Sequence, residues 1–277
     1  MSAGTTPAPT KRRSTLVHDS WVIGRRGLIH VRRHPEALSD ATIQPIIFVL
    51  LFGYVFGGAI TPPGGGDYKE FLMGGVFAQT IVFGCFGVAM SLATDRSNGA
   101  IQRFHAMPIQ PAAVLWGHAM ANLIRAVIPI VIMSITGLIV GWRIRGDLGH
   151  TLTAFGLMLG FSFAMIWVGV LLASAMRTVE GVQGVAFVVL FPITFLASTF
   201  VPIDTLPDGL RQVAEWNPTT TLAEALRVHF ENPGSGPSAG AAWPVQHSTA
   251  YTLIWIVGMI ALFAPLAVKL YWRANRD

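Results

Sequence analysis

Charged residues are scarce in this sequence, and that scarcity points to a class of protein. Asp, Glu, Lys and Arg make up 12% of the 277 residues, whereas 52% of the chain is hydrophobic. Soluble domains carry about 25% charged residues. With a mean hydropathy of +0.55, the composition is typical of an integral membrane protein and excludes an ordinary soluble domain.

Other absences exclude several kinds of site. The single cysteine, Cys85, lies in an apolar run, which excludes an internal disulfide and predicts a small core residue. None of the three lysines follows a glycine, so the P-loop that binds ATP is missing. His30 and His34 lack a third zinc ligand nearby, and neither H-E-x-x-H nor G-x-S-x-G occurs. We therefore expect this chain to bind no nucleotide or metal.

What the chain does contain is apolar runs, each near the roughly 20 residues that cross a bilayer as a helix. They predict an all-α membrane fold with six spans. Five of these cover residues 39–60, 70–94, 151–175, 182–201 and 248–270, and the third span begins between 112 and 123 and ends at Gly141. The long connection after the fifth span predicts two short helices, at 208–215 and 222–230, and then a flexible stretch over 232–240.

The basic residues predict the orientation. With six spans, both chain ends lie on one side, which holds 13 of the 19 Lys and Arg residues; the other side holds five, and Arg125 falls within the third span. Because cytoplasmic loops carry the excess of basic residues, we expect a protein of the bacterial cell membrane with both termini on the cytoplasmic side. The net charge of +5 could indicate a nucleic-acid partner, but these arginines flank apolar runs, so we expect none.

The residues before the first span predict two segments. Residues 1–14 are small and polar and predict a disordered tail. Residues 15–36 predict an amphipathic helix lying on the inner leaflet, and 37–277 form the transmembrane domain. The alternative for 15–36 is a solvated basic segment that only fixes the topology. The helix would seat Trp21 in the interface and turn four arginines toward the headgroups: Arg25, Arg26, Arg32 and Arg33.

Few charges fall within the predicted spans, and only Arg125 and His118 come close. Proton-coupled transporters usually place acids or histidines in mid-membrane, so such a mechanism is disfavoured. Arg125 either snorkels to the inner surface or faces an internal cavity and pairs with Asp95 or Glu180.

Three segments, in the same order, resemble the ABC-2 type export permeases. DRSNGAIQRFHAMPIQPAAVLWGHAMANLIR, from Asp95, is similar to the family's cytoplasmic loop and the start of the next span. FLASTFVPIDTLPDGLRQVAEWNPTTTLAEALR, from Phe195, is similar to its Phe-x-Pro exit, external helix, Asn-Pro and second helix ending in Arg. YKEFLMGGVFAQT also fits, with Met73 where many members carry Pro. The resemblance begins near Trp21 and is nearest to the daunorubicin/doxorubicin-resistance permeases of actinobacteria.

The resemblance implies a half-transporter that exports lipophilic compounds. Two ATP-binding subunits would supply the energy and hold ATP and Mg, and a second permease, either the same chain or a paralogue, would complete the unit. Segment 95–108 would then be the coupling segment, with a helix within 95–107 that Asn98-Gly99 would open and Pro108 would end. The alternative is an inert polar connector. The expected coupling residues are Asp95, Arg96, Gly99, Ile101, Arg103, Phe104, His105, Met107 and Pro108.

The substrate path would lie between two permeases and be lined by the first, second and fifth spans. The long connection would act as an external gate, with Pro202, Asn217 and Pro218 as its candidate residues. For each path residue the alternative is an ordinary core or lipid-facing phenylalanine. The candidates for the path are Phe48, Phe52, Phe77, Phe83, Phe191 and Phe195.

Two other functions remain open. The same architecture would serve to export a lipid, glycolipid or polysaccharide. An integral membrane enzyme acting on lipid would instead need a polar cluster at one face. The external group available for this has a spacing that fits amphipathic helices better than a site; its members are Asp204, Asp208, Glu215, Glu224 and His229.

Overall fold

The computed structural model describes residues 36–58, 60–62, 65–97, 111–176, 178–232, 236 and 240–274, and this part of the chain is helical and contains no strand. The predicted all-α class is thus confirmed. In chain order the α-helices are α2 (Glu36–Leu51), α3 (Tyr68–Ser97), α5 (Pro111–Val140), α6 (Leu148–Ala175), α7 (Val179–Phe195), α8 (Asp208–Glu215), α9 (Pro218–His229), α10 (Trp243–Gln246) and α11 (Ser248–Ala274). A π-helix, η1 (Phe52–Phe56), extends α2, and a short 3-10 helix, η2 (Ile203–Thr205), precedes α8.

Four of these helices are long and apolar enough to cross a membrane. They lie at Tyr68–Ser97, Trp116–Val140, Leu148–Ala175 and Ser248–Leu270. Two shorter apolar helices, Ile43–Phe56 and Val179–Phe195, occupy the places of the first and fifth predicted spans. The count of six crossings therefore stays a prediction, while the multi-pass membrane character is established.

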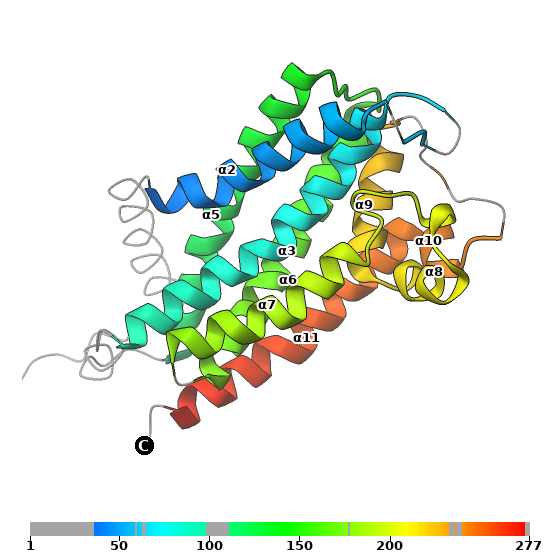
Figure 1. Ribbon diagram of the computed structural model, residues 1–277. Coiled ribbons are helices and arrows are strands. Elements are labelled where there is room, and N and C mark those ends of the chain that lie inside the picture. Colours follow the sequence, from blue (N-terminus) through cyan, green and yellow to red (C-terminus); the bar gives the residue numbers. More distant parts are fainter. Residues whose placement is uncertain are drawn as a thin grey trace, which may run out of the picture.

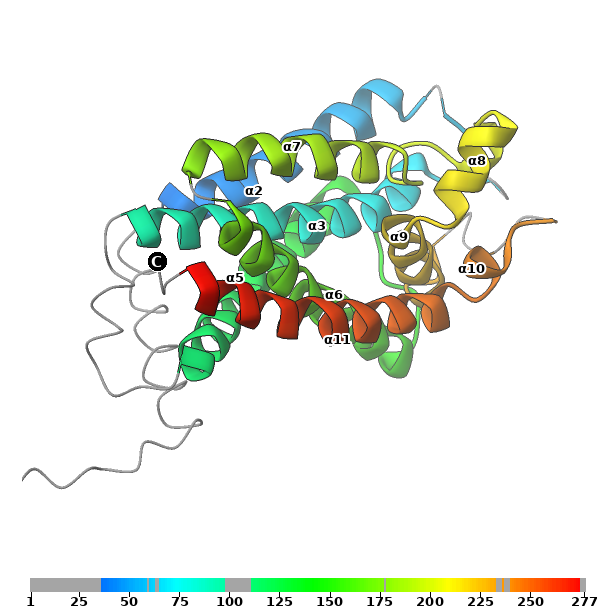
Figure 2. The same ribbon diagram turned by 90° about the horizontal axis from the view of Figure 1, so that it is seen from below.

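The long helices form an up-and-down bundle. Successive helices reverse direction, so α2, α5 and α7 end where α3, α6 and α11 begin (Figure 1). We call this the α9 end, because α8, α9 and α10 gather there, and α11 ends at the opposite end (Figure 2). Helix α6 packs between α3 and α11, while α2 packs against α3 and α5. Helix α9 packs against α3, α6 and α11, so it lies within the bundle rather than over it.

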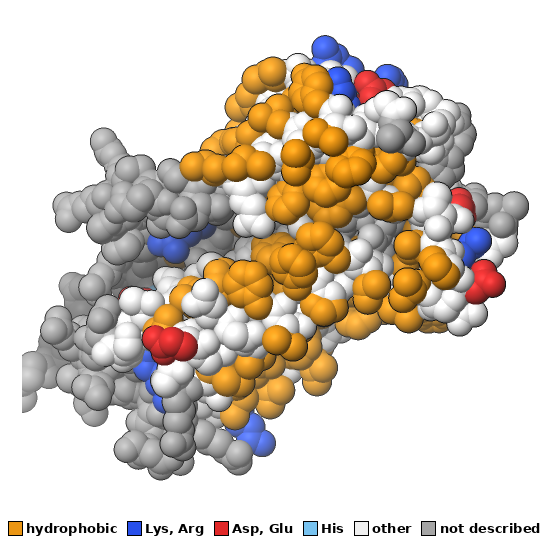
Figure 3. Space-filling view, viewed as in Figure 1, with side chains coloured by type: hydrophobic (Ala, Val, Ile, Leu, Met, Phe, Trp, Pro, Cys, Tyr) orange, Lys and Arg blue, Asp and Glu red, His pale blue; other side chains and the backbone are white. Residues whose placement is uncertain are grey.

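The surface matches a membrane setting. In Figure 3, hydrophobic side chains cover the middle of the face, and charged side chains lie toward its two ends. Exposed Ile139, Val188 and Val257 are 80%, 74% and 65% accessible on three different helices. Apolar side chains this exposed need an apolar surrounding, and lipid tails supply it.

Local signals explain where the helices begin and end. Gly141 adopts a φ of +116°, a conformation that favours glycine, and Trp142 N donates to Gly137 O (2.9 Å) as α5 ends. The Asp147 carboxylate caps α6 by accepting from His150 N (2.7 Å). Asn217 caps α9 in the same way, and Pro218 is its first residue. Helix α9 therefore starts at Pro218, whereas the sequence predicted its start at residue 222.

One predicted span is wrong at its end. The fifth was expected over 182–201, but α7 ends at Phe195. Residues 196–200, which we call the bridge segment, leave the helix and carry buried polar groups at Ser198 and Thr199. Ser198 N donates to Thr220 Oγ1 of α9, and the Thr199 hydroxyl donates to Thr194 O in the last turn of α7, so these groups are bonded although the helix has ended.

Candidate functional site

An aromatic ladder joins the first and fifth apolar helices at the α9 end. We define it as Phe48, Phe52, Phe200, Phe195 and Phe191. Phe200 of the bridge segment stacks on Phe52 of η1 with ring centroids 4.3 Å apart, and it contacts Phe48 at 5.5 Å. On its other side Phe200 contacts Phe195 at 5.6 Å, and Phe195 stacks on Phe191 at 4.3 Å. Four of the six predicted path residues are thus brought together.

The ladder is open on one flank. Phe191 and Phe195 are 45% and 42% exposed, whereas Phe200 is buried. Its two ends continue along exposed apolar faces, through Phe56 of η1 and Phe187 of α7. An exposed run of stacked rings is able to bind a flat lipophilic molecule by further stacking.

The other two predicted path residues lie elsewhere. Phe77 is buried in a second aromatic group, where it contacts Trp142 (5.6 Å) and Phe230 (6.3 Å). Phe83 is half-buried farther along α3. The structure places Phe77 in the packed core, which is the alternative that the sequence left open for each of these phenylalanines.

The central ring, Phe200, was missed as a path residue. Its sequence signal was present, because Phe200 opens the Phe-x-Pro pattern that ends at Pro202. Tyr68 at the start of α3 fixes its backbone, since Tyr68 Oη donates to Phe200 O (2.7 Å). Pro202 lies two residues later and is the N-cap of η2, and its carbonyl accepts from Thr205 N (3.2 Å).

The two other candidate gate residues lie at the joint between α7 and α9. Asn217 Oδ1 accepts from Thr219 N (2.9 Å), and Asn217 Nδ2 donates to Ile193 O (2.6 Å) in the last turn of α7. Pro218 follows as the first residue of α9. One side chain thus begins α9 and ties it to the helix that carries Phe191 and Phe195.

The least expected residue is Arg227 in α9, which is completely buried. Its Nη1 donates to Glu224 Oε1 (2.5 Å) and Ser198 Oγ (2.9 Å), and its Nη2 donates to Ser198 O (2.6 Å). Its Nε donates to Phe71 O (2.9 Å), and the guanidinium lies over the Phe71 ring at 3.6 Å. Burial lowers the pKa of Arg227, and the charge of Glu224 opposes that shift.

The sequence had counted Arg227 as an external basic residue and Glu224 as part of an external acidic group. We call Arg227, Glu224 and Ser198 the clasp. Ser198 Oγ also donates to Glu224 Oε1 (2.9 Å), so each member of the clasp contacts the other two.

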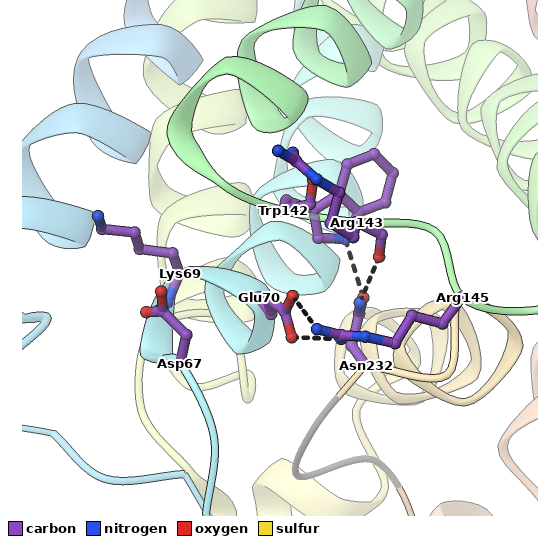
Figure 4. A network of polar contacts seen from close by, with 7 residues as sticks. All are labelled: Asp67, Lys69, Glu70, Trp142, Arg143, Arg145 and Asn232. Atoms are coloured by element: carbon purple, nitrogen blue, oxygen red, sulfur yellow. Dashed lines mark hydrogen bonds and ion pairs between the residues drawn. The ribbon is translucent and has the colours of Figure 1, made fainter.

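A second polar network closes the connection between α5 and α6 (Figure 4). Arg145 donates to both oxygens of the buried Glu70 at the start of α3, at 2.5 and 2.7 Å. These hydrogen bonds raise the pKa of Arg145. Asn232, beyond α9, accepts from Trp142 Nε1 (2.9 Å) and donates to Arg143 O (2.9 Å). The network fastens this connection to both α3 and α9.

Of the polar residues considered for a membrane enzyme, Asp204, Asp208 and Glu215 lie near Arg211, and the other two lie apart from them. Arg211 pairs with Asp204 (3.4 Å) and Glu215 (3.0 Å), while Glu224 belongs to the clasp. His229 Nε2 lies 3.0 Å from Thr249 Oγ1. Within the ranges described, no group of His, Cys, Asp and Glu is arranged to hold a metal ion.

At the opposite end, Asp95 and Arg96 occupy the last turn of α3. Arg96 Nη1 donates to Met176 O (3.3 Å) between α6 and α7. Arg125 Nη1 lies 3.5 Å from Asn122 Oδ1, one turn earlier in α5. The N-terminal segments 1–14 and 15–35 and the remaining coupling residues lie outside the described residues, the latter being Gly99, Ile101, Arg103, Phe104, His105, Met107 and Pro108.

Comparison with known proteins agrees with the helical architecture. Residues 18–230 match the ABC-2 type transporter family. The chain is 29% identical over 275 residues to a daunorubicin resistance ABC transporter permease protein of Streptomyces coeruleorubidus, covering 99% of this chain and 92% of that one. It is 26% identical over 241 residues to a probable doxorubicin resistance ABC transporter permease protein of Mycobacterium tuberculosis, with coverages of 85% and 81%. An inner membrane transport permease of Escherichia coli is 21% identical over 197 residues, with coverages of 70% and 75%.

Proposed function

Because this chain belongs to the ABC-2 type transporter family, we propose that it is the permease subunit of an exporter for lipophilic compounds of the drug or antibiotic type. Relatives named for daunorubicin and doxorubicin resistance support this cargo class. The observation that carries the proposal is the aromatic ladder, whose exposed rings Phe191 and Phe195 offer stacking surfaces to flat lipophilic molecules.

Energy comes from a separate ATP-binding subunit, since the chain's own sequence contains no P-loop. Two such subunits, holding ATP and Mg, act on two permeases, the second being the same chain or a paralogue. The coupling contact is segment 95–108. The bond from Arg96 to Met176 O supports this, because it joins the start of that segment to the turn between α6 and α7.

All six apolar helices cross the membrane in this proposal, with both termini in the cytoplasm and the α9 end outside. The alternation of helix direction supports it, because the connections at the α9 end are those that carry few basic residues. The bridge segment, Pro202, Asn217 and Pro218 then form the external gate over the ladder.

The test is ATP hydrolysis by the full chain reconstituted in liposomes with its ATP-binding subunit. Lipophilic aromatic antibiotics should stimulate hydrolysis and be moved across the bilayer. Phe195→Ala should raise the half-stimulating concentration ~3–10-fold, because one stacking partner is lost. Val188→Ala, at an exposed site on α7 outside the ladder, is the matched control and should leave it unchanged. Stimulation by lipids or glycolipids alone would support the alternative cargo.

The coupling contact has its own test. Arg103→Glu or Phe104→Asp should abolish stimulation while the permease still folds, because each change places a repulsive or polar group on the proposed docking face. Co-purification of the ATP-binding subunit measures the contact directly. Unchanged co-purification and transport in both variants would remove segment 95–108 from the mechanism.

A further inference from the structure

The position of Phe200 depends on what holds the bridge segment, residues 196–200. Phe200 is the only ring of the ladder that contacts both Phe52 of η1 and Phe195 of α7. It belongs to no helix, and the residues around it, Ser198 and Thr199, are buried. A shift of this segment would therefore part the two halves of the ladder.

Helix α9 binds every hydrogen-bonding group of Ser198. Ser198 N donates to Thr220 Oγ1 (3.1 Å), and Ser198 O accepts from Arg227 Nη2 (2.6 Å). The hydroxyl accepts from Arg227 Nη1 (2.9 Å) and donates to Glu224 Oε1 (2.9 Å). These bonds fix the bridge segment two residues before Phe200.

Helix α9 is fixed against α3 in turn. Arg227 Nε donates to the carbonyl of Phe71 (2.9 Å). Two glycines of α3 make the close approach possible: a Cβ on Gly74 would lie 2.7 Å from Arg227 Cγ, and one on Gly75 would lie 2.0 Å from Thr199 O. Helices α3 and α9 and the bridge segment thus pack as one block, with the guanidinium at its centre.

A buried ion pair is a poor way to gain stability, because apolar residues of similar volume often hold a structure as well. Its advantage is geometric, since a planar guanidinium directs several hydrogen bonds at once. We propose that Arg227, through the clasp, is a positioning residue that sets Phe200 within the aromatic ladder and so determines which lipophilic substrates the exporter accepts. The inference rests on the proposed function of the ladder as the substrate path.

The sharpest variant is Arg227→Lys, which keeps the charge but cannot donate to Phe71 O and Ser198 O together. Arg211→Lys is the matched control, because Arg211 pairs with acids of its own neighbourhood outside the clasp. Ser198→Ala is the second variant. It removes one hydroxyl with little change in volume, and it stands in if Arg227→Lys fails to assemble.

Two measurements are made on the reconstituted complex with its ATP-binding subunit. The first is the half-stimulating concentration of a panel of aromatic antibiotics, set beside the maximal rate of hydrolysis. The second is the rate at which a short bifunctional thiol reagent links Phe52→Cys to Phe200→Cys in a Cys85→Ser background. This second rate reports the position of the bridge segment and needs no substrate.

If the clasp positions Phe200, Arg227→Lys should change half-stimulating concentrations by roughly tenfold, the effect of losing one charge-assisted hydrogen bond. The change should differ among antibiotics while the maximal rate holds, and linking should slow in parallel. The inference is overturned if an assembled Arg227→Lys complex behaves like Arg211→Lys in both measurements, or loses only maximal rate. Failure of every antibiotic to stimulate the parent complex would instead refute the proposed function, and the linking rate would still decide the clasp.

Discussion

Helices α8 and α9 follow one another in the same connection, and each carries an arginine paired with a glutamate on its own helix. Arg211 pairs with Glu215 four residues later, and Arg227 pairs with Glu224 three residues earlier. Yet the Arg211 side chain is 28% exposed and that of Arg227 is 0% exposed. A pair of similar spacing is thus partly exposed in one helix, where only the Glu215 side is buried, and lies at the centre of a packed block in the other.

The difference arises from the remaining faces of the two helices. Helix α8 leaves Leu210, Val213 and its C-cap Trp216 exposed, so only one side of it is packed. Helix α9 buries all residues from Thr219 to Arg227 against α3, α6 and α11. A charge in such a helix has to find partners inside the protein, because water does not reach it.

The largest effect on stability is expected from Arg227→Met. It leaves the Glu224 charge buried without its partner, and we expect a loss of about 3–5 kcal/mol in the free energy of unfolding. Thermal unfolding in detergent measures it. The double variant Arg227→Met with Glu224→Leu should recover most of the stability, because the apolar pair removes the unpaired charge. A double variant as unstable as the single one would contradict this account.

Glycine substitutions test whether the packing around α9 is closer than that around α8. Gly75→Ala forces a methyl group toward Thr199 O, and overpacking of this kind costs about 1–3 kcal/mol. Gly209→Ala in α8 meets open space and should stabilise the helix by up to about 1 kcal/mol. Both are read from the unfolding midpoint. Equal effects of the two substitutions would mean that α9 is no more closely packed than α8.

A smaller effect is expected at the helix starts. Asn217→Ala removes the cap of α9 and the bond to Ile193 O, and loss of a cap costs about 1 kcal/mol. Pro207 begins α8 without a side-chain cap, so Pro207→Ala is the control. Asn217→Ser retains a capping oxygen but does not reach Ile193, and it should fall between the two. If Asn217→Ser matches Asn217→Ala, the link to α7 rather than the cap carries the effect.

The smallest effect belongs to Arg211→Gln. The Arg211 side chain is 28% exposed and that of Glu215 is 8% exposed, so solvent and salt screen the pair in part, and its loss should cost less than about 1 kcal/mol in the free energy of unfolding. Measurement at low and high ionic strength tests this. If Arg211→Gln lowered the unfolding midpoint as much as Arg227→Met does, the two arginine–glutamate pairs would not differ in their contribution to stability.

The sequence predicted the apolar helices because hydropathy is a local property. It also predicted α8, whose bounds are those expected, Asp208–Glu215. Helix α9 begins at Pro218 rather than at the predicted residue 222, because Asn217 caps it and proline is favoured at the first helical position. This start has a local signal in the sequence.

The burial of Arg227 had no comparable local signal. Its partner Phe71 lies 156 residues away in the chain, and only the packing of α9 on α3 brings the two together. The aromatic ladder was predictable only in part, because one of its rings is also positioned by contacts between distant segments. Phe48, Phe52, Phe191 and Phe195 lie on the helices that were expected to line a path, but the position of Phe200 depends on where α7 ends.

The π-helix η1 has a consequence for where this chain tolerates a change of length. Its hydrogen bonds span one residue more than those of an α-helix, so the loss of one residue between Phe52 and Phe56 would convert them to α-helical bonds. The helix on the two sides of that deletion would keep nearly the same rotation, whereas one residue lost from α2 would rotate its two sides by about 100°. A single in-frame codon deletion should thus be tolerated in η1 and not in α2. Growth of both kinds of deletion mutant on an antibiotic panel would compare them, and equal losses of growth would exclude this.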